Sequence, residues 1–485
     1  MVQSNRTGAG ESNGISRRRF VEAAGATGAA ATVAGCLGGD DGDGGPIQLS
    51  ADADFEEISD DIQEALREAG LDEDVEIEVL PGDFETDSRL AEYTQALDAG
   101  RSSPDIFMMD SGWTMPFIFR GQLVNLSDAL SEETLEYVGS DYLPATIDTA
   151  SDPETGDLYG LPLFPDYPTM QYRKDLVEEA GYDPDGENWA TEPMSWLEFA
   201  EMAADVWEYH GGEDEYEYAF TTQADAYEGL ACCTFNETMT SFGGAYFGDH
   251  DNLFGSVGDR PITVDEEPLY DTIRMMRSFM YGPDAEDADP DYPRLANSDL
   301  VEFTEEDARE PFTNGDAIFH RNWPYSIVIN GDDEEWGEDL GVMPLPYGVE
   351  EGQGNYAGTG GTAAALGGWH LTVNPNSERQ EEALQVLEAF ASENVMLTLF
   401  ELNGNIPPDP SVTQQADEDL VGPVGRYLDT LAVAGENTVP RPVTDIWPEQ
   451  SAMVYQEVHD AYRGEKTPEA AMSDLDGQLE ESEQV

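Results

Sequence analysis

The fold is decided by Ile47-Gln48-Leu49-Ser50, Val75-Glu76-Ile77-Glu78-Val79 and Asp105-Ile106-Phe107-Met108-Met109, three apolar segments that two helical patterns separate. The first helical pattern covers 55–66, with apolar residues three and four positions apart on one face, and the second covers 88–99. Strands and helices that alternate in this way predict a doubly wound sheet, whose ligands bind at the carboxyl ends of the strands.

The rest of the chain continues the same mixture and predicts two interleaved α/β lobes. Helical patterns cover 174–180, 195–209, 228–242, 267–280, 377–403, 451–463 and 467–479. Strand patterns cover 315–319 and 369–373, and 347–368 between them is glycine-rich and irregular. Gly404 is expected to cap the helix that ends at 403.

The chain is long enough for two to three domains, and it is extremely acidic. Its 485 residues include 103 Asp and Glu against 21 Lys and Arg, which gives a formal net charge of −82. Such a field repels phosphate backbones, so we exclude nucleic acid as a partner and expect anionic ligands to be disfavoured. The Debye length falls from about 10 Å at about 0.1 M salt to about 3 Å at about 1 M, so molar salt screens the repulsion among the acidic residues. We therefore interpret the acidity as adaptation to strong brine. The alternative is an acidic protein that works in ordinary salt.

The amino-terminal segment predicts export and a lipid anchor. Ser16-Arg17-Arg18-Arg19-Phe20 resembles a twin-arginine export signal, and the small residues after it are too few and too weakly apolar for a membrane span of about 20 residues. Val33-Ala34-Gly35-Cys36 resembles a lipobox, with Cys36 as the residue that receives the lipid. We predict a twin-arginine lipoprotein signal over 1–35, a Gly/Asp linker over 36–45, and a location at the extracellular face of the cell membrane.

The two remaining cysteines, Cys232 and Cys233, are adjacent. Adjacent cysteines bridge each other only with strain, and a reactive thiolate would need basic neighbours, which this stretch lacks. We interpret them as small core residues, and a disulfide between them is the alternative.

The sequence carries no motif for catalysis or for a cofactor. It has no P-loop, no His-Glu-x-x-His and no nucleophile elbow. Its five histidines lie far apart, without the spacing of metal ligands. We therefore expect no metal, no cofactor and no enzymatic activity.

Aromatic and polar residues instead gather beside predicted strand and loop ends. The clusters are Asp110-Ser111-Gly112-Trp113, Phe164-Pro165-Asp166-Tyr167, Arg321-Asn322-Trp323-Pro324-Tyr325, Gly367-Gly368-Trp369 and Pro440-Arg441-Pro442. An aromatic ring can pack on the apolar face of a sugar, while carboxylate, amide and guanidinium groups bind its hydroxyls. A neutral sugar also avoids repulsion by the acidic surface. The clusters therefore predict a polar cleft for a neutral sugar.

The order of motifs resembles that of a known family. The motifs are Met109-Asp110 with Trp113, Tyr159-Gly160-Leu161-Pro162, Tyr172-Arg173-Lys174-Asp175-Leu176, Tyr227-Glu228-Gly229-Leu230, Arg321-Asn322-Trp323-Pro324-Tyr325, Leu366-Gly367-Gly368-Trp369 and Arg441-Pro442. Over about 46–485 the chain resembles the extracellular solute-binding proteins of ABC sugar importers, in particular their trehalose/maltose-binding branch. The resemblance implies a periplasmic-binding-protein-like fold of two lobes, each a doubly wound sheet with flanking helices.

The same resemblance implies three hinge crossings between the lobes, which we expect near 157–160, 323–327 and 373–377. The amino-terminal lobe would then comprise 46–157 and 326–373. The carboxyl-terminal lobe would comprise 160–322 and 377–485.

The resemblance also implies a set of ligand-binding residues. They are Glu56, Arg89, Asp110, Trp113, Asp166, Trp323, Tyr325, Gly367, Gly368, Trp369 and Arg441. Arg89, Asp110, Asp166 and Arg441 would hold hydroxyls, Trp323, Tyr325 and Trp369 would stack on the sugar or wall it, and the amides of Gly367 and Gly368 would lie near its rim.

The chain departs from the family in two places. Phe164 stands where family members often carry a tyrosine before the cleft aspartate, and the stretch 232–237 is one residue longer than usual. Both departures concern which sugar is bound.

The function implied is that of a monomeric, lipid-anchored binding protein that delivers a disaccharide of trehalose or maltose type to the permease subunits of an ABC importer. One alternative is an exported glycoside hydrolase, in which Asp110 and Asp166 would act as the two carboxyl groups. The other is a binding protein that serves a sensor instead of a transporter.

Overall fold

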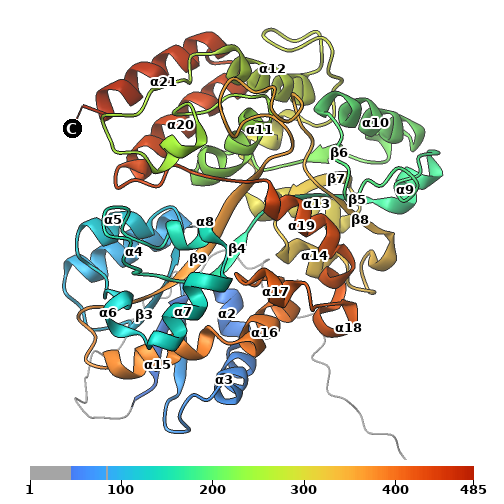
Figure 1. The fold of residues 1–485 in the computed structure, drawn as a ribbon. Helices are drawn as coiled ribbons and strands as arrows, with labels where there is room; N and C mark the ends of the chain where they lie inside the picture. The colour runs from blue at the N-terminus through green and yellow to red at the C-terminus, as the bar shows by residue number, and fades with distance from the viewer. Residues whose placement is uncertain (1–44, 83–85, 485) are drawn as a thin grey trace, which may run out of the picture. The chain divides into compact units, whose positions relative to one another are not determined.

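The structure is a computed structural model that describes residues 45–82 and 86–484. Residues Pro46–Val485 form one compact unit, whose elements are labelled in Figure 1. The predicted export signal over 1–35, the lipidation site Cys36 and nearly all of the linker lie outside the described residues. In the described part of the chain, no helix has the length and apolar character that crossing a bilayer requires.

The first sheet contains the strands that the opening stretch predicts. Its strands are β1 (Ile47–Ala51), β2 (Ile77–Pro81), β3 (Ile106–Asp110), β4 (Leu161–Asp166), β9 (Ala364–Val373) and β10 (Thr438–Pro440). The order is β10-β9-β3-β1-β2, and β4 also pairs with β9. Strands β1, β2 and β3 are parallel, with Leu49 opposite Val79 and Ile106, as the doubly wound prediction requires. Strand β9 runs antiparallel to both β3 and β4.

The second sheet is mixed rather than parallel throughout. Its strands are β5 (Thr169–Arg173), β6 (Tyr218–Thr221), β7 (Ala317–Asn322) and β8 (Leu340–Met343), in the order β6-β7-β5-β8. Only the β6–β7 pair is parallel, because β5 pairs antiparallel with both β7 and β8.

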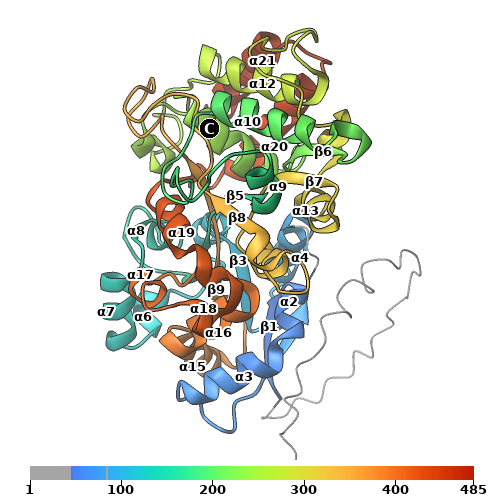
Figure 2. The ribbon, with the colours of Figure 1, turned by 90° about the vertical axis from the view of Figure 1, so that its right-hand side faces the viewer.

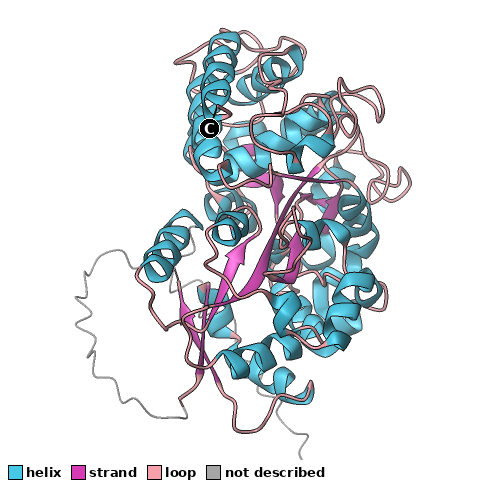
Figure 3. Cartoon of the chain, turned by 60° about the vertical axis from the view of Figure 1, so that its left-hand side comes forward, coloured by secondary structure: helices cyan, strands magenta, loops and turns pink. Residues whose placement is uncertain are grey.

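Helices cover both sheets, as Figures 2 and 3 show. Around the first sheet are α2 (Ala53–Glu57), α3 (Ser59–Glu68), α4 (Thr86–Asp98), α5 (Thr114–Phe119), α6 (Leu126–Ala129), α7 (Glu132–Asp141), α8 (Pro144–Asp148), α15 (Gln380–Phe390), α16 (Glu393–Asn403) and α17 (Pro410–Thr413). Around the second are α9 (Lys174–Glu179), α10 (Trp196–Tyr209), α11 (Phe235–Ser241), α12 (Glu267–Tyr281), α13 (Glu305–Asn314), α14 (Tyr325–Asn330), α18 (Glu418–Val421), α19 (Leu428–Glu436), α20 (Trp447–Tyr462) and α21 (Pro468–Ser482). The short helical turns are η2 (Gly212–Asp214), η3 (Leu230–Thr234), η4 (His250–Phe254), η5 (Ser298–Glu302), η6 (Gly337–Asp339) and η7 (Gly422–Tyr427).

Each sheet has its own hydrophobic core, so the unit has two lobes. Ile47, Leu49 and Ile106 pack in the first core with Leu387 of α15 and Leu399 of α16. The second core joins the four-stranded sheet to helices from α9 to α21. Burial of apolar area stabilises both cores, and each lobe is large enough to hold a core of its own.

The chain passes between the lobes at places other than those expected. It leaves the first sheet between β4 and β5, returns between β8 and β9, and leaves again after α17. Between α19 and α20 it reaches the first sheet once more, where β10 pairs with β9. The assignment of 326–373 to the amino-terminal lobe is therefore wrong for β8, which pairs with β5 of the second sheet. The assignment of 377–485 to the carboxyl-terminal lobe is wrong for α15 and α16, whose apolar faces pack in the first core. Periodicity shows that a helix has an apolar face but does not show which sheet that face covers.

The helix predicted over 377–403 is two helices. Ser392 has an extended backbone, and its hydroxyl donates to the carbonyl of Ala389, so the helical hydrogen bonds stop there and resume in α16. Gly404 follows α16 with a φ of 71°, as expected of a carboxyl-terminal cap.

Candidate ligand-binding site

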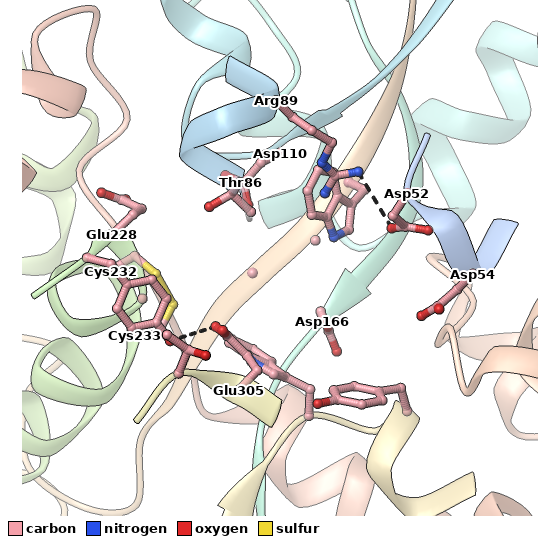
Figure 4. A pocket seen from close by; sticks show the side chains of 18 of the residues that line it. Asp52, Asp54, Thr86, Arg89, Asp110, Asp166, Glu228, Cys232, Cys233 and Glu305 are labelled. Carbon is pink, nitrogen blue, oxygen red and sulfur yellow. Dashed lines mark hydrogen bonds and ion pairs between the residues drawn. A yellow bond between two sulfur atoms is a disulfide. The ribbon is translucent and has the colours of Figure 1, made fainter. Parts of the chain in front are cut away.

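A cavity of about 260 Å³ lies where residues of both lobes meet (Figure 4). Its volume is close to the lower end of the range of about 300–1,000 Å³ found for small-molecule sites. Among the predicted site residues, Arg89, Asp110, Asp166, Trp323, Tyr325, Gly367, Gly368, Trp369 and Arg441 line it. These residues span more than 350 positions of the chain, so only the tertiary fold brings them together.

Arg89 of α4 and Trp369 of β9 form one wall. The Arg89 guanidinium carbon lies 4.1 Å from the centroid of the Trp369 ring, and Nη1 lies 3.6 Å from a carboxylate oxygen of Asp52. Arg89 is 1% exposed, and its Nε and Nη1 have no hydrogen-bond partner among the described residues. A buried guanidinium with free donors can bind a hydroxyl oxygen of a ligand.

Trp113 does not line the cavity. It is buried in a core cluster with Tyr93 and Phe117, and it meets Trp369 edge-on with 6.2 Å between ring centroids. The prediction that Trp113 contacts the ligand is therefore wrong in this structure. Its indole instead packs against the Trp369 ring, which does line the cavity.

Glu56 is exposed and lies outside the cavity, so its assignment as a site residue is also wrong. Phe55 points into the first core, and the next residue on a helix is turned by about 100°. Asp52 and Asp54 of the same segment line the cavity instead. Burial raises the pKa of Asp54 to about 7.

Arg441 joins the buried carboxylate of Asp110 in the first lobe to the partly buried carboxylate of Glu228 in the second. Its Nη1 lies 2.9 Å from Asp110 Oδ1, at the end of β3, and 3.3 Å from Glu228 Oε1. Gly112 also donates its N–H to Asp110 at 2.7 Å, and a Cβ on Gly112 would lie 2.5 Å from the guanidinium of Arg441. Burial raises the pKa of Glu228 to about 7, although Arg441 opposes that rise.

Gly368 allows β4 and β9 to approach closely beside the cavity. Its φ is +120°, and a Cβ there would lie 2.6 Å from the carbonyl oxygen of Phe164. Any other residue would be strained at this φ and would push the strands apart.

Trp323 and Tyr325, which follow β7, form the wall contributed by the second lobe. Trp323 is 8% exposed, and the Arg321 guanidinium carbon lies 4.5 Å from its ring centroid. The Tyr325 hydroxyl donates to Glu306 at 2.6 Å, and the Tyr227 hydroxyl donates to Glu305 at 2.8 Å.

The cavity contains polar residues that the sequence analysis did not assign to the site. They are Asp52, Asp54, Thr86, Asp87, Asp225, Tyr227, Glu228, Thr304, Glu305, Glu306, Asn403 and Asn405. Tyr227 and Glu228 belong to the motif Tyr227-Glu228-Gly229-Leu230, which contributes to the family resemblance, so the sequence did offer a reason to assign them to the site. The acidic residues among the others gave no such signal, because carboxylates occur throughout this chain.

Cys232 and Cys233 are not free core thiols, because they form a disulfide that lines the cavity. They lie in η3, a π-helical turn, and such turns frequently occur at functional sites. A π-helical turn holds one residue more than an α-helical turn, which agrees with the extra residue expected in this stretch.

Asp166, at the end of β4, is expected to make the apo protein less stable as the pH rises. Burial raises its pKa to about 8, although the nearby Arg321 guanidinium opposes the rise, whereas an unfolded aspartate has a pKa of about 3.9. Between these values the folded state holds a proton that the unfolded state has released, so stability falls with pH. The Asp166→Asn variant lacks this titrating group, so its free energy of unfolding should not fall with pH in this way. The difference in unfolding free energy, variant minus wild type, should increase by about 1 kcal/mol per pH unit between about pH 5 and 7, and should become constant above about pH 8. Thermal unfolding across this range measures it, and a constant difference would contradict the protonated state.

Comparisons with known proteins agree with the two-lobed geometry. The profile of the family described as bacterial extracellular solute-binding protein matches residues 53–396. A probable ABC transporter-binding protein of Deinococcus radiodurans is 27% identical over 409 residues, which are 81% of this chain and 84% of that protein. The sn-glycerol-3-phosphate-binding periplasmic protein of Escherichia coli K12 is 21% identical over 398 residues, 78% of this chain and 81% of that protein.

Solved structures are also similar. The maltose-bound MalE3 protein of T. maritima is 27% identical and has a TM-score of 0.72, over 90% of this chain and 98% of that one. An ABC transporter solute-binding protein of Thermotoga lettingae, bound with alpha-D-tagatose, has the same fold at 19% identity and a TM-score of 0.70, over 90% of this chain and 99% of that one.

Proposed function

This chain belongs to the bacterial extracellular solute-binding protein family, and we propose that it captures a neutral sugar between its lobes and delivers it to the permease of an ABC importer. The sugar we propose is a disaccharide of maltose or trehalose type. The observation that carries the proposal is the convergence of Arg89, Asp110, Trp323, Trp369 and Arg441 on one cavity. The maltose bound by the MalE3 protein supports the same class of ligand.

The charges in the cavity favour a neutral ligand over an anion. Arg89 and Arg441 are the cationic side chains among the described residues that line it, and both are paired with carboxylates. A phosphate would have to displace those carboxylates while facing the remaining acids. We therefore do not extend the ligand of the sn-glycerol-3-phosphate-binding relative to this chain.

Ligand capture follows from the two-lobed arrangement. The cavity takes Asp52 and Arg89 from the first lobe, and Trp323 and Glu305 from the second. A sugar that contacts both walls binds the closed form better than an open one, and so shifts the population toward closure. The closed form is the state that docks on the permease. The protein does this as a monomer.

The test is a thermal-shift screen in molar KCl with maltose, trehalose, glucose and sn-glycerol 3-phosphate. A ligand that binds the folded state adds about 2.7 kcal/mol of stability at 100 times its Kd. We expect a disaccharide to raise the melting temperature and sn-glycerol 3-phosphate to leave it unchanged; the reverse result would contradict the proposal. Release of glucose from either disaccharide would instead indicate the glycoside hydrolase alternative.

We also propose that the protein is exported by its twin-arginine signal and held at the outer face of the membrane by lipid on Cys36. Cys36→Ser should release the protein into the medium, because the lipid is the only anchor in the proposal. Fractionation of cells and medium measures this. Continued attachment of the variant to the membrane would contradict the lipid anchor.

The acidity should make the fold depend on salt. With a formal net charge of −82, transfer from about 2 M KCl to about 0.05 M lengthens the range of charge repulsion several-fold, and we expect the protein to unfold. Far-UV circular dichroism during dialysis measures the loss. Native secondary structure retained at low salt would contradict adaptation to brine.

A further inference from the structure

The disulfide between Cys232 and Cys233 lies in the wall of the ligand cavity, and we propose that it is a contact surface for the sugar, so that its reduction weakens binding. This inference rests on the proposed function. In Figure 4 the disulfide lies beside Glu228, across the cavity from Arg89 and Asp52. A structural disulfide in the middle of a core would not line a binding cavity.

The disulfide is part of a continuous apolar surface. Cys232, Cys233, Trp323 and Ala365 pack together in one buried cluster, with Tyr325 against it, and we call this cluster the disulfide plate. The two cysteines are 4% and 3% exposed, and Trp323 is 8% exposed. The plate therefore joins the sulfur atoms to the indole that the sequence predicted as a sugar-stacking residue.

Outside the disulfide plate, the apolar side chains that line the cavity are Phe55, Phe164 and Trp369, which lie in or against the first core. One face of Trp369, the other predicted indole, is covered by the Arg89 guanidinium. A sugar ring has an apolar face that needs an apolar partner. The disulfide plate is the partner that the second lobe offers.

Reduction changes this surface directly. One dithiothreitol supplies two electrons and two protons, the S–S bond becomes two thiols, and the dithiothreitol becomes its cyclic disulfide. The two sulfurs are then no longer bonded and must separate, within a buried cluster that has little free space. We expect them to separate by moving into the cavity or by displacing Trp323. Either movement removes apolar contact from the sugar.

The effect must be reciprocal. If reduction weakens sugar binding by some factor, then the sugar must favour the disulfide over the two thiols by the same factor. A disulfide that serves only the stability of the fold would show no such coupling. The coupling therefore separates a role in the wall of the site from a role in fold stability alone.

The experiment uses the Cys36→Ser protein, in which Cys232 and Cys233 are the remaining cysteines. Titration calorimetry in molar KCl measures the Kd of maltose and of trehalose for the oxidised and the reduced protein. We expect reduction to raise the Kd about tenfold, because it disturbs both the disulfide and the adjoining Trp323 surface. A second measurement uses buffers that contain reduced and oxidised dithiothreitol. The ratio of reduced to oxidised dithiothreitol at which half of the protein is reduced should rise by the same factor when the sugar is saturating.

Two further measurements keep the result interpretable. The Cys232→Ala/Cys233→Ala variant should bind like the reduced protein, and its Kd should not respond to dithiothreitol. Equal Kd values for the oxidised and reduced protein, or a half-reduction ratio that the sugar does not move, would overturn the inference while leaving the proposed function intact. If neither disaccharide binds the oxidised protein, the proposed function fails and the inference fails with it.

Discussion

Trp323→Ala is expected to weaken sugar binding by about 50- to 100-fold. Truncation of a tryptophan anchor in a well-packed binding site typically costs about 2 kcal/mol or more of binding free energy, and about 2.5 kcal/mol corresponds to a factor in this range. Trp323 lines the cavity between the disulfide and the Arg321 guanidinium. Titration calorimetry with the sugar identified by the thermal screen measures the change.

Trp336→Ala is the matched control for Trp323. Trp336 also carries a stacked guanidinium, that of Arg173 at 3.8 Å, but it packs against the second core and does not line the cavity. Both variants should lose stability in the apo form, because both indoles are packed. Only Trp323→Ala should lose affinity, and equal affinity in the two variants would remove Trp323 from the site.

Arg321→Met is expected to lower the free energy of unfolding by about 3–5 kcal/mol, because it leaves a buried carboxylate without its partner. Arg321 is 2% exposed and makes two hydrogen bonds of 2.7 Å to Glu237 and one of 2.7 Å to Gln223. Glu237 also accepts the N–H of Ala365 on β9, so the pair ties the second lobe to the strand that runs between the lobes. Denaturant unfolding in molar KCl measures the loss.

The control for Arg321 is Arg274→Met. Arg274 pairs with Glu267, Asp271 and Glu469, more acids than Arg321 has, but it lies near the surface. Molar salt screens such pairs, so we expect a loss of at most about 1 kcal/mol. The double variant Arg321→Met/Glu237→Gln should recover much of the loss of Arg321→Met, because neither charge then remains buried alone. Similar losses for Arg321→Met and Arg274→Met would contradict the importance of burial.

The elements of the fold could be predicted because they depend on local patterns. The alternation of Val75 to Val79 and the apolar run 106–109 predicted strands that the structure contains as β2 and β3. The assignment of helices to lobes could not be predicted in the same way. The apolar face of α15 fits either sheet by composition, and only the packed core shows that it covers the first.

The site shows the same division. Asp110 directly follows the predicted strand 105–109 and could be placed at the cavity because parallel strands end at one edge of a sheet, whereas Asp166 was assigned through the family resemblance. Trp113 lies only three residues after Asp110, yet its indole is packed in a core. A one-residue step rotates a side chain by about 100° on a helix, so closeness in sequence does not decide which side chains reach the cavity.

By itself the sequence determined the α/β character and the acidic composition, because these depend on residue content and on short-range periodicity. Only the tertiary structure decided that Asp52 and Asp54 rather than Glu56 face the cavity, that Cys232 and Cys233 are bonded there, and where the chain crosses between lobes. These features depend on contacts between segments hundreds of residues apart, and no local pattern carries the information about which of many similar apolar faces and carboxylates will meet.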